Sequence, residues 1–374
     1  MVKKGINKLP IALSNNQALE IFKLLAEVNK KMGVLKSEFN HSLVNESIVS
    51  MFSLNESVQS TRIEGTQVTF TDMVEERGSK NPSWEEIEVR NYQRALQQGA
   101  TTIEQGYPIS TRLVKDLHRV LMENARGTGS SGGGFRKVQN FIGPTNKMED
   151  AVYIPIEANR INEYMENLEF YTNGTPHVSF RKFNKTDGFV FDEECDSLIK
   201  IAIMHAQFES IHPFLDGNGR LGRILIALMA IKEDLIDYPV FFVSEELEKE
   251  RSKYYDLLNG VRGDNPDWYS WIHFFITSCG RMTDRLITKL RDAEELAKKG
   301  LRKLSLQSEK NIWLYTFSDP FTTATRVSQA LKITPATARK SLQTLSDANL
   351  LYSDKDVKRN RKYRNYDLMR ILNS

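Results

Sequence analysis

ESIHPFLDGNGRLGR, residues 209 to 223, is the stretch around which the rest of the sequence can be organised. It holds a histidine, a carboxylate, two glycines around an asparagine and two arginines within about four helical turns of chain. Apolar residues at helical spacing lead up to it from Asp196 to Ile211, and the same spacing resumes at Leu221. The stretch therefore predicts two helices joined by a tight loop, with Gly217 to Gly219 leading directly into the second helix.

The backbone of this loop predicts an anion-binding site. The first N–H groups of a helix have no partner inside the helix, and they lie at the positive end of its dipole. Glycines let a ligand approach the chain closely. Arg220 and Arg223 are three residues apart on the new helix, so both can clamp an anion with planar, forked donors. Two arginines indicate more than one phosphate.

Two further side chains add chemistry to this site. Asp216 directly precedes the loop and is placed to hold Mg²⁺, which prefers hard oxygen ligands and takes few of them from protein. His212 lies four residues earlier, and its near-neutral pKa suits a general base. A transition metal at His212 and Asp216 is the alternative, although no histidine or cysteine cluster supports it. Each residue alone has a common structural explanation; their combination predicts phosphate chemistry.

Helical spacing of apolar residues dominates the remaining chain, as in Ser110 to Met122 and Asn159 to Tyr171. One region breaks the pattern. Two β-favouring pieces, Val138 to Ile142 and Ala151 to Ile154, are separated by turn-forming residues, which predicts a hairpin. The sequence thus indicates a mainly α-helical protein with one β-hairpin.

The C-terminal segment is basic. Residues 319 to 374 carry 11 Lys and Arg against 5 Asp and Glu, whereas residues 1 to 318 carry 40 against 43. After a linker-like zone near residues 298 to 308 come a helix, a turn at 333 to 335, a helix at 336 to 348 and two short strands joined by a basic turn. This order suits a winged helix-turn-helix. It predicts DNA binding, with a protein-interaction or dimerisation module as the alternative.

The whole chain has ordinary globular composition, with 374 residues of which 40% are hydrophobic and 26% charged. Cys195 and Cys279 match neither a zinc spacing nor a disulfide framework, so a reducing cytoplasm is the expected compartment. We find no signal peptide and no apolar run of membrane-spanning length. We expect a cytoplasmic protein without a membrane partner.

The run HPFLDGNGR, followed by Leu221, Gly222 and Arg223, matches in full the motif HPFx[DE]GNGRxxR of Fic-domain proteins. The resemblance covers most of the chain. It implies a mainly α fold with a Fic helical core, a β-hairpin flap, an N-terminal helical extension and a C-terminal winged helix-turn-helix. The implied domains are residues 1–105 for the N-terminal helical region, 106–300 for the Fic catalytic domain and 301–374 for the winged helix.

The resemblance implies a protein adenylyltransferase. Such an enzyme moves AMP from its substrate ATP to a Tyr, Thr or Ser hydroxyl of a target protein, or of itself, and releases pyrophosphate. By family role His212 deprotonates the hydroxyl, Asp216 holds Mg²⁺ at the α- and β-phosphates, and Arg223 grips the γ-phosphate. The other motif residues would contact the phosphates: Gly217, Asn218, Gly219, Arg220, Leu221 and Gly222.

The resemblance also extends to the flap and the nucleobase pocket. The flap would hold a target segment by adding a strand to its edge, centred on Ala151, Val152 and Tyr153. Tyr254 and Tyr255 match paired tyrosines that line the family's nucleobase pocket. Arg262 stands where some members have an asparagine, so the resemblance does not fix a strict preference for adenine.

STRIEG, residues 60 to 65, predicts a built-in inhibitor. Ser60 and Glu64 share one helical face, and Gly65 is a natural residue just past a helix end. Glu64 would lie in the last helical turn, where the dipole disfavours negative charge, so it needs a cationic partner. The stretch resembles the inhibitory motif [ST]xxxE[GN], in which the glutamate pairs with the second motif arginine, here Arg223. We expect an autoinhibited resting enzyme.

Other functions stay open on the sequence alone. One is a DNA-binding regulator that carries a Fic domain as a sensor. Another is a Fic enzyme that removes AMP or transfers a different phosphate-containing group. A pure scaffold is disfavoured by the intact His212, Asp216 and Arg223. The sequence does not identify the target, and a homodimer through helix surfaces is compatible with it.

Overall fold

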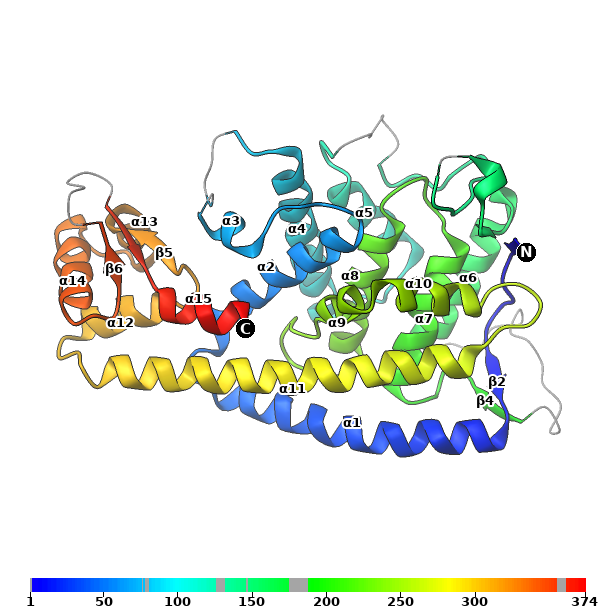
Figure 1. Cartoon of the computed structure of the whole chain (residues 1–374), viewed down its shortest axis with the longest axis horizontal. Helices are drawn as coiled ribbons and strands as arrows, with labels where there is room; N and C mark the ends of the chain where they lie inside the picture. Colours follow the sequence, from blue (N-terminus) through cyan, green and yellow to red (C-terminus); the bar gives the residue numbers. More distant parts are fainter. Residues whose placement is uncertain are drawn as a thin grey trace.

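The computed structural model describes residues 2–75, 77, 81–125, 132–145, 147–174, 188–354 and 361–374. Helices dominate these residues, which confirms the predicted mainly α fold (Figure 1). None of these helices is long and apolar enough to cross a bilayer. The α-helices that precede the C-terminal unit are α1 (Asn15–His41), α2 (Asn45–Ile63), α3 (Phe70–Glu75), α4 (Trp84–Glu104), α5 (Thr111–Leu121), α6 (Ile161–Asn173), α7 (Ser197–Ile211), α8 (Asn218–Lys232), α9 (Ser244–Lys249), α10 (Arg251–Gly260) and α11 (Trp268–Leu301).

The two longest helices, α1 and α11, lie side by side along one side of the molecule (Figure 1). A capping box starts α1, in which the Ser14 hydroxyl accepts from the Gln17 amide and the Gln17 side chain accepts from the Ser14 amide. The buried positions of α1 recur every three or four residues, as amphipathic packing requires. They are Ala18, Ile21, Leu25, Val28, Met32, Leu35 and Phe39.

The centre of the body is the pair α7 and α8, which flank the motif loop. Every residue of α7 after Ser197 is buried, so this helix is packed on all sides, against α6, α8, α10 and α11. Helix α8 packs on α4 through a close approach at Gly99, where a Cβ would lie 2.5 Å from Leu228 Cδ1. This packing fixes the beginning of α8 relative to α2, because α2 also packs on α4.

The strands outside the C-terminal unit are short. Antiparallel pairing joins β2 (Ile11–Leu13) to β4 (Phe189–Phe191), and parallel pairing joins β1 (Lys3–Lys4) to β3 (Tyr153–Ile154). Two 3₁₀ helices, Met148–Asp150 and Ala158–Arg160, flank β3.

The predicted hairpin is smaller than expected. Its second arm is β3, but Val138 to Phe141 form no strand and Ile142 alone bridges to Tyr153. The reason lies in Arg136, whose amide donates to Pro213 O and whose guanidinium donates to His212 O and Ile156 O. These bonds hold the first arm against the loop after α7, so its backbone does not run along β3.

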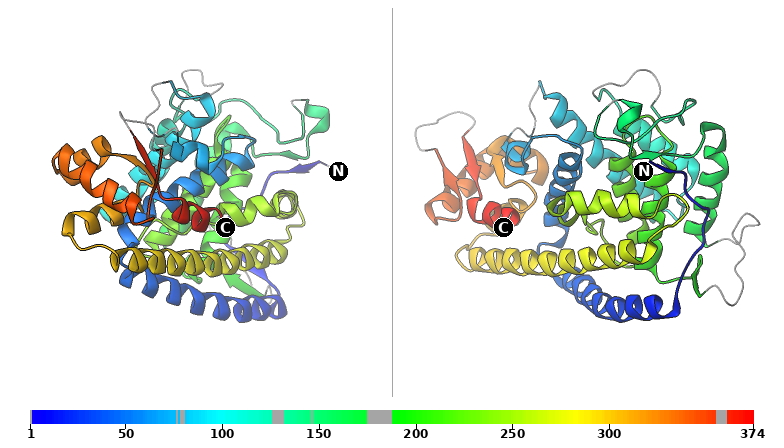
Figure 2. Two further views of the ribbon diagram at one scale, coloured as in Figure 1. Left: turned by 60° about the vertical axis from the view of Figure 1, so that its left-hand side comes forward. Right: turned by 45° about the vertical axis from the view of Figure 1, so that its right-hand side comes forward.

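The C-terminal unit has the expected winged helix-turn-helix order, with a three-stranded antiparallel sheet in the order β5-β7-β6. It lies at one end of α11 (Figure 2), whereas α7 packs on α11 near the other end, where Trp271 Nε1 donates to Ala202 O. Lys289 of α11 donates to Leu372 O at 2.8 Å, which attaches the unit to the body. Its elements are α12 (Gln307–Tyr315), β5 (Phe321–Thr323), α13 (Ala324–Leu331), α14 (Pro335–Asp347), β6 (Tyr352–Ser353), β7 (Lys362–Arg364) and α15 (Tyr366–Asn373). Most of the predicted basic turn, residues 355–360, lies outside the described residues.

Candidate active site

The motif loop between α7 and α8 is held by its own side chains. His212 ends α7 with a left-handed backbone, φ 49°. Asn218 Oδ1 accepts from Phe214 N at 2.9 Å and its Nδ2 donates to Phe214 O at 3.0 Å, which closes the loop on itself. Phe214 is fully buried and stacks on the His118 ring at 3.7 Å between centroids. The loop is therefore rigid before any ligand arrives.

Two glycines of the loop occupy positions that a side chain would block. Gly217, the N-cap of α8, has φ 78°, and a Cβ there would lie 2.7 Å from Met122 Sδ. A Cβ on Gly219 would lie 2.3 Å from Glu64 Oε1 and 3.1 Å from Arg223 Nη1. The Glu64 carboxylate therefore rests against the first turn of α8, where the sequence predicts an anion-binding cradle.

Glu64 and Arg223 form the predicted ion pair, with Glu64 Oε1 2.5 Å from Arg223 Nη2. Ser60 accepts two further hydrogen bonds from the same guanidinium. Its hydroxyl accepts from Arg223 Nε at 2.8 Å, and its carbonyl accepts from Nη2 at 3.0 Å. Burial opposes the charge of Glu64, but the charge and hydrogen bond of Arg223 lower the carboxyl pKa below its usual value. The pair is thus ionised and holds the end of α2 over the start of α8.

A cavity of about 460 Å³ opens beside this pair. Seven of the predicted site residues line it: Glu64, Val152, His212, Gly219, Arg223, Tyr254 and Tyr255. Eight further residues line the cavity, and for seven of them the sequence predicted no ligand contact; the eighth is Arg262, which stands where some family members have an asparagine. The eight are Ile142, Gly143, Pro144, Glu209, Arg251, Leu258, Asn259 and Arg262. One elongated ligand could therefore contact the cradle, the imidazole and the tyrosines together.

His212 is set up as a proton acceptor. Its Nδ1 lies 3.4 Å from Glu209 O, and since a carbonyl only accepts, Nδ1 carries the proton and Nε2 is the basic nitrogen. Burial and the positive charge of Arg262 lower the imidazole pKa to about 4. The ring is therefore neutral at pH 7.

Asp216 has the exposure and chemistry that a magnesium ligand needs. Its side chain is 64% exposed, and Oδ1 accepts from Gly217 N at 2.6 Å and lies 3.6 Å from Arg220 Nη2. No group of three or more His, Cys, Asp or Glu side chains that could hold a metal occurs in the described ranges. One carboxylate beside a phosphate cradle suits Mg²⁺, which completes its octahedron with phosphate oxygens and water.

Arg220 lies elsewhere than the sequence predicted. Its guanidinium is buried and forms an ion pair with Glu88 of α4, Nη1 to Oε2 at 3.1 Å. It therefore ties α8 to α4 and does not line the cavity. The Asn218 side chain serves the loop, and Leu221 is fully buried with its amide bonded to Gly217 O. Gly222 faces Glu209, whose Oε1 would lie 2.3 Å from a Cβ there.

The aromatic end of the cavity is formed by α10. Tyr254 is buried with its hydroxyl 2.9 Å from His205 Nε2, whereas Tyr255 is 41% exposed. Their rings lie 5.2 Å apart. Arg262 is already engaged: its Nη2 donates to Glu209 O at 3.2 Å, and its guanidinium lies 4.1 Å from the Tyr153 ring centroid. It joins β3 to the end of α7.

The predicted strand edge of the flap is already paired. Lys3 N donates to Val152 O at 3.1 Å, and Gly5 N donates to Ile154 O at 2.9 Å. Tyr153 is buried and its hydroxyl donates to Ser210 O at 2.7 Å, while Ala151 is buried outside the cavity. The strand β1 thus lies at the edge of β3 where a target strand was predicted to add. A short β-compatible run is the only indication of this pairing in the sequence.

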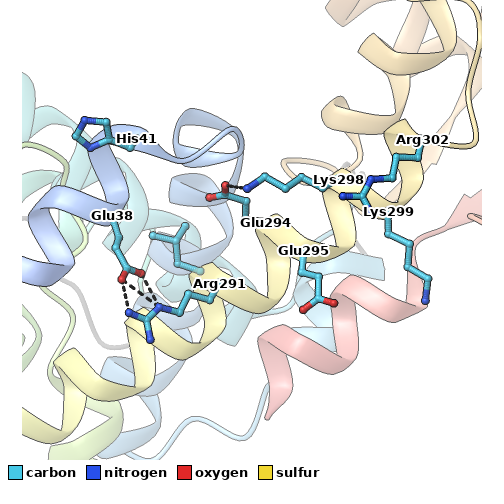
Figure 3. A pocket seen from close by; sticks show the side chains of 9 residues that line it. Glu38, His41, Arg291, Glu294, Glu295, Lys298, Lys299 and Arg302 are labelled. Carbon is cyan, nitrogen blue, oxygen red and sulfur yellow. Dashed lines mark hydrogen bonds and ion pairs between the residues drawn. The ribbon is translucent and has the colours of Figure 1, made fainter.

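A larger hollow of about 740 Å³ lies between the end of α1 and the C-terminal half of α11 (Figure 3). Its lining charges pair with one another, as Glu38 with Arg291 and Glu294 with Lys298. No motif residue reaches it. The cavity beside His212 is therefore the candidate active site.

Comparison with known proteins agrees with this geometry. Residues 108–230 match the Fic/DOC family, and residues 22–101 match the Fic/DOC family N-terminal domain. The chain is 23% identical over 174 residues to the protein adenylyltransferase Fic of Drosophila grimshawi, covering 46% of this chain and 30% of that protein. It is 44% identical over 46 residues to a probable protein adenylyltransferase of Aquifex aeolicus, covering 12% and 14% respectively. The chain thus matches less than a third of the length of these relatives.

Solved structures share the fold at low sequence identity. A Fic family protein from Desulfovibrio desulfuricans aligns with a TM-score of 0.58 and 18% identity, covering 96% of this chain and 98% of that one. A Fic domain-containing signaling protein from Bacteroides thetaiotaomicron aligns with a TM-score of 0.54 and 17% identity, covering 71% and 97%. These structures show the fold. The matches of residues 22–101 and 108–230 place the chain in the Fic/DOC family, with the family's N-terminal domain preceding its core.

Proposed function

We propose that this protein transfers AMP from ATP to a Tyr, Thr or Ser hydroxyl of a target protein, or of itself, and that Glu64 inhibits the transfer. One observation carries the proposal: an anion, the Glu64 carboxylate, rests on Gly219 and Arg223 within the cavity that His212 lines. That carboxylate stands in for a phosphate oxygen. The relatives named as adenylyltransferases support the same reaction class.

The residues around the cavity suit this transfer. His212 Nε2 takes the proton of the acceptor hydroxyl, whose oxygen then forms a bond to the α-phosphorus of ATP. The bond from that phosphorus to the bridging oxygen breaks, and pyrophosphate leaves. Asp216 would hold Mg²⁺, which supplies positive charge at the α- and β-phosphates. The cradle amides of α8 and the Arg223 guanidinium keep the triphosphate oriented.

Inhibition follows from competition for one cation. Arg223 is the buried cation at the far end of the cradle, and Glu64 already occupies its Nη2. A γ-phosphate placed there would have to displace the carboxylate. ATP would then bind with its phosphates out of line, which leaves the α-phosphorus badly oriented for attack. The geometry is also compatible with the opposite reaction, in which Glu64 orients a water molecule that removes AMP from a modified protein, because this carboxylate lines the same cavity as His212.

The test uses purified Glu64→Gly protein with Mg²⁺ and ATP labelled at either the α- or the γ-phosphate. The proposal expects protein labelling from α-labelled ATP alone, and no labelling when His212→Ala is added to Glu64→Gly. Competition with unlabelled GTP, CTP and UTP measures base preference. Labelling from the γ-phosphate would indicate phosphate transfer and overturn the proposal. If attached AMP were lost from the protein that retains Glu64 but not from the Glu64→Gly variant, the site would instead be assigned to AMP removal.

A further inference from the structure

The helix-turn-helix of the C-terminal unit is mostly cationic. Residues 320 to 346 contain no Asp or Glu, and their four cationic side chains are Arg326, Lys332, Arg339 and Lys340. The acidic residue of α14 is Asp347 at its C-terminal end, which is exposed and whose Oδ1 accepts from Gln343 Nε2 at 2.8 Å. Arg326 is bound to Asp319, with Nη2 2.5 Å from Oδ1. Within the described ranges, neither Arg339 nor Lys340 forms an ion pair or a side-chain hydrogen bond. These two charges remain available for an external anion.

Helix α14 is amphipathic, with one buried stripe of side chains and one stripe that faces outward. Ala338, Leu342 and Leu345 are fully buried, and α14 packs on α12 and α13. The opposite stripe, at positions i, i+3, i+4 and i+7, consists of Ala336, Arg339, Lys340 and Gln343. The first three of these are exposed. We call these four residues the outer face of α14.

No contact of this face with the catalytic body occurs among the residues that the structure describes. The unit attaches to the body through other elements: α15 packs on α11, and Arg77 donates to Ser318 O at 2.7 Å. Helix α14 lies at the outer end of the unit, on the side away from α11 and α15 (Figure 1). An extended ligand could therefore lie along α14 without meeting the catalytic body.

The sheet extends the same surface. Arg361, next to β7, donates from Nη1 to Gln343 Oε1 at 2.9 Å, and Lys362 of β7 is exposed. Cations from the second helix and from the base of the wing thus share one side of the unit. That arrangement allows a helix to enter a groove while the flanking cations meet the phosphates on either side.

We infer that the outer face of α14 binds double-stranded DNA, and this holds whether or not the cavity transfers AMP. A protein partner fits less well, because interface cores are rich in aromatic and other large apolar residues and Ala336 is the sole apolar residue of this face. Arg339 and Lys340 reach phosphates or base edges, and the small Ala336 permits close approach of the helix to the groove floor. Phosphate contacts dominate the affinity, so binding is salt-dependent.

The test measures fluorescence anisotropy of a labelled mixed-sequence 30-base-pair duplex titrated with the full chain at several salt concentrations. Unchanged protein should bind at low salt, and affinity should fall as salt rises. Arg339→Glu with Lys340→Glu should weaken binding about tenfold or more and reduce the salt slope by about two. Lys23→Glu with Lys30→Glu makes the same charge change on exposed positions of α1, a helix outside the C-terminal unit, and should leave affinity within about twofold.

Three results would overturn the inference. The first is no binding to the duplex tighter than about 100 µM at 50 mM salt, the weak end of ordinary non-specific binding. The second is equal loss of affinity in the α14 and α1 double variants, which would indicate a general charge effect. The third is binding that survives the α14 changes. His212→Ala should bind the duplex unchanged, so failure of AMP transfer and failure of DNA binding are separable.

Discussion

The Glu64 carboxylate at the end of α2 is bonded to the Arg223 guanidinium, which comes from the second turn of α8. Arg223 is 1% exposed, so its charge needs an anion, and Glu64 is the one present. In the proposed reaction the γ-phosphate of ATP would replace this carboxylate. Inhibition and nucleotide alignment would then be two uses of one cation.

Glu64→Gly should raise AMP transfer on the order of tenfold to a hundredfold, because a coupling of this kind is typically 1–3 kcal/mol. The measurement is the initial rate of incorporation of α-labelled AMP at saturating ATP and Mg²⁺. Glu46→Gly is the matched control, an exposed glutamate in the first turn of the same helix, and it should leave the rate unchanged. Equal rates for Glu64→Gly and unchanged protein would contradict autoinhibition.

Glu88→Ala should lower the free energy of unfolding by about 3 kcal/mol, because it removes the buried carboxylate of Arg220 and leaves only the exposed Asp216, 3.6 Å away, as its counter-charge. Glu104→Ala removes an exposed carboxylate from the end of the same helix, α4, and should change stability by less than about 0.5 kcal/mol. Urea unfolding followed by circular dichroism measures both. If Glu88→Ala behaved like Glu104→Ala, the Arg220 contact would not be structural, and Arg220 would again be a candidate phosphate ligand.

The motif could be interpreted from sequence because its parts are neighbours in the chain. His212, Asn218 and Gly217 act through one loop and one helix start, so their spacing already fixes most of their geometry. The helix-end position of Glu64 predicted that this carboxylate needs a cation, and the resemblance to the inhibitory motif implied that the cation is Arg223. Local rules were sufficient wherever the interacting groups lie within a few turns of each other or match a known pairing.

Partners from distant segments could not be predicted. Nothing in the spacing of α4 indicates that Glu88 faces Arg220, because helical periodicity defines a buried face without naming what packs on it. The same holds for Arg136, which pulls the first arm of the hairpin onto the loop, and for Lys3, which pairs with β3. Two-residue strands carry too little pattern to specify a partner.

The AMP transfer rate of Glu64→Gly protein should stay high well below pH 6.5, since burial and Arg262 lower the His212 pKa to about 4. A depressed histidine pKa keeps the base neutral at all pH values above it, so activity is lost only as pH falls through that value. Initial rates between about pH 3.5 and 8, a range that spans the expected acid limb, measure this. Arg262→Gln removes the neighbouring charge and keeps a donor, so its acid limb should move toward higher pH. An acid limb near 6.5 in the parent would contradict the assignment.

The position of β1 leads to a separate prediction about how a target protein reaches the edge of β3. It pairs with β3 through the amides of Lys3 and Gly5, on the edge where a target strand would add. The parallel register alternates, so the Lys4 amide does not donate to β3. If a target adds at this edge, β1 must leave first, and weakening β1 should favour the target.

Lys3→Pro removes the amide donor to Val152 O and the Lys3 Nζ donor to Gly260 O, and Lys4→Pro places the same ring one residue away without removing either bond. One hydrogen bond is worth about 1 kcal/mol, so in the Glu64→Gly background Lys3→Pro should raise labelling of lysate proteins by about fivefold or more over Lys4→Pro. The KM for ATP should be equal in both, because neither residue lines the cavity. Equal labelling by the two variants would place target binding on another edge of the flap, and β1 would then be a structural strand only.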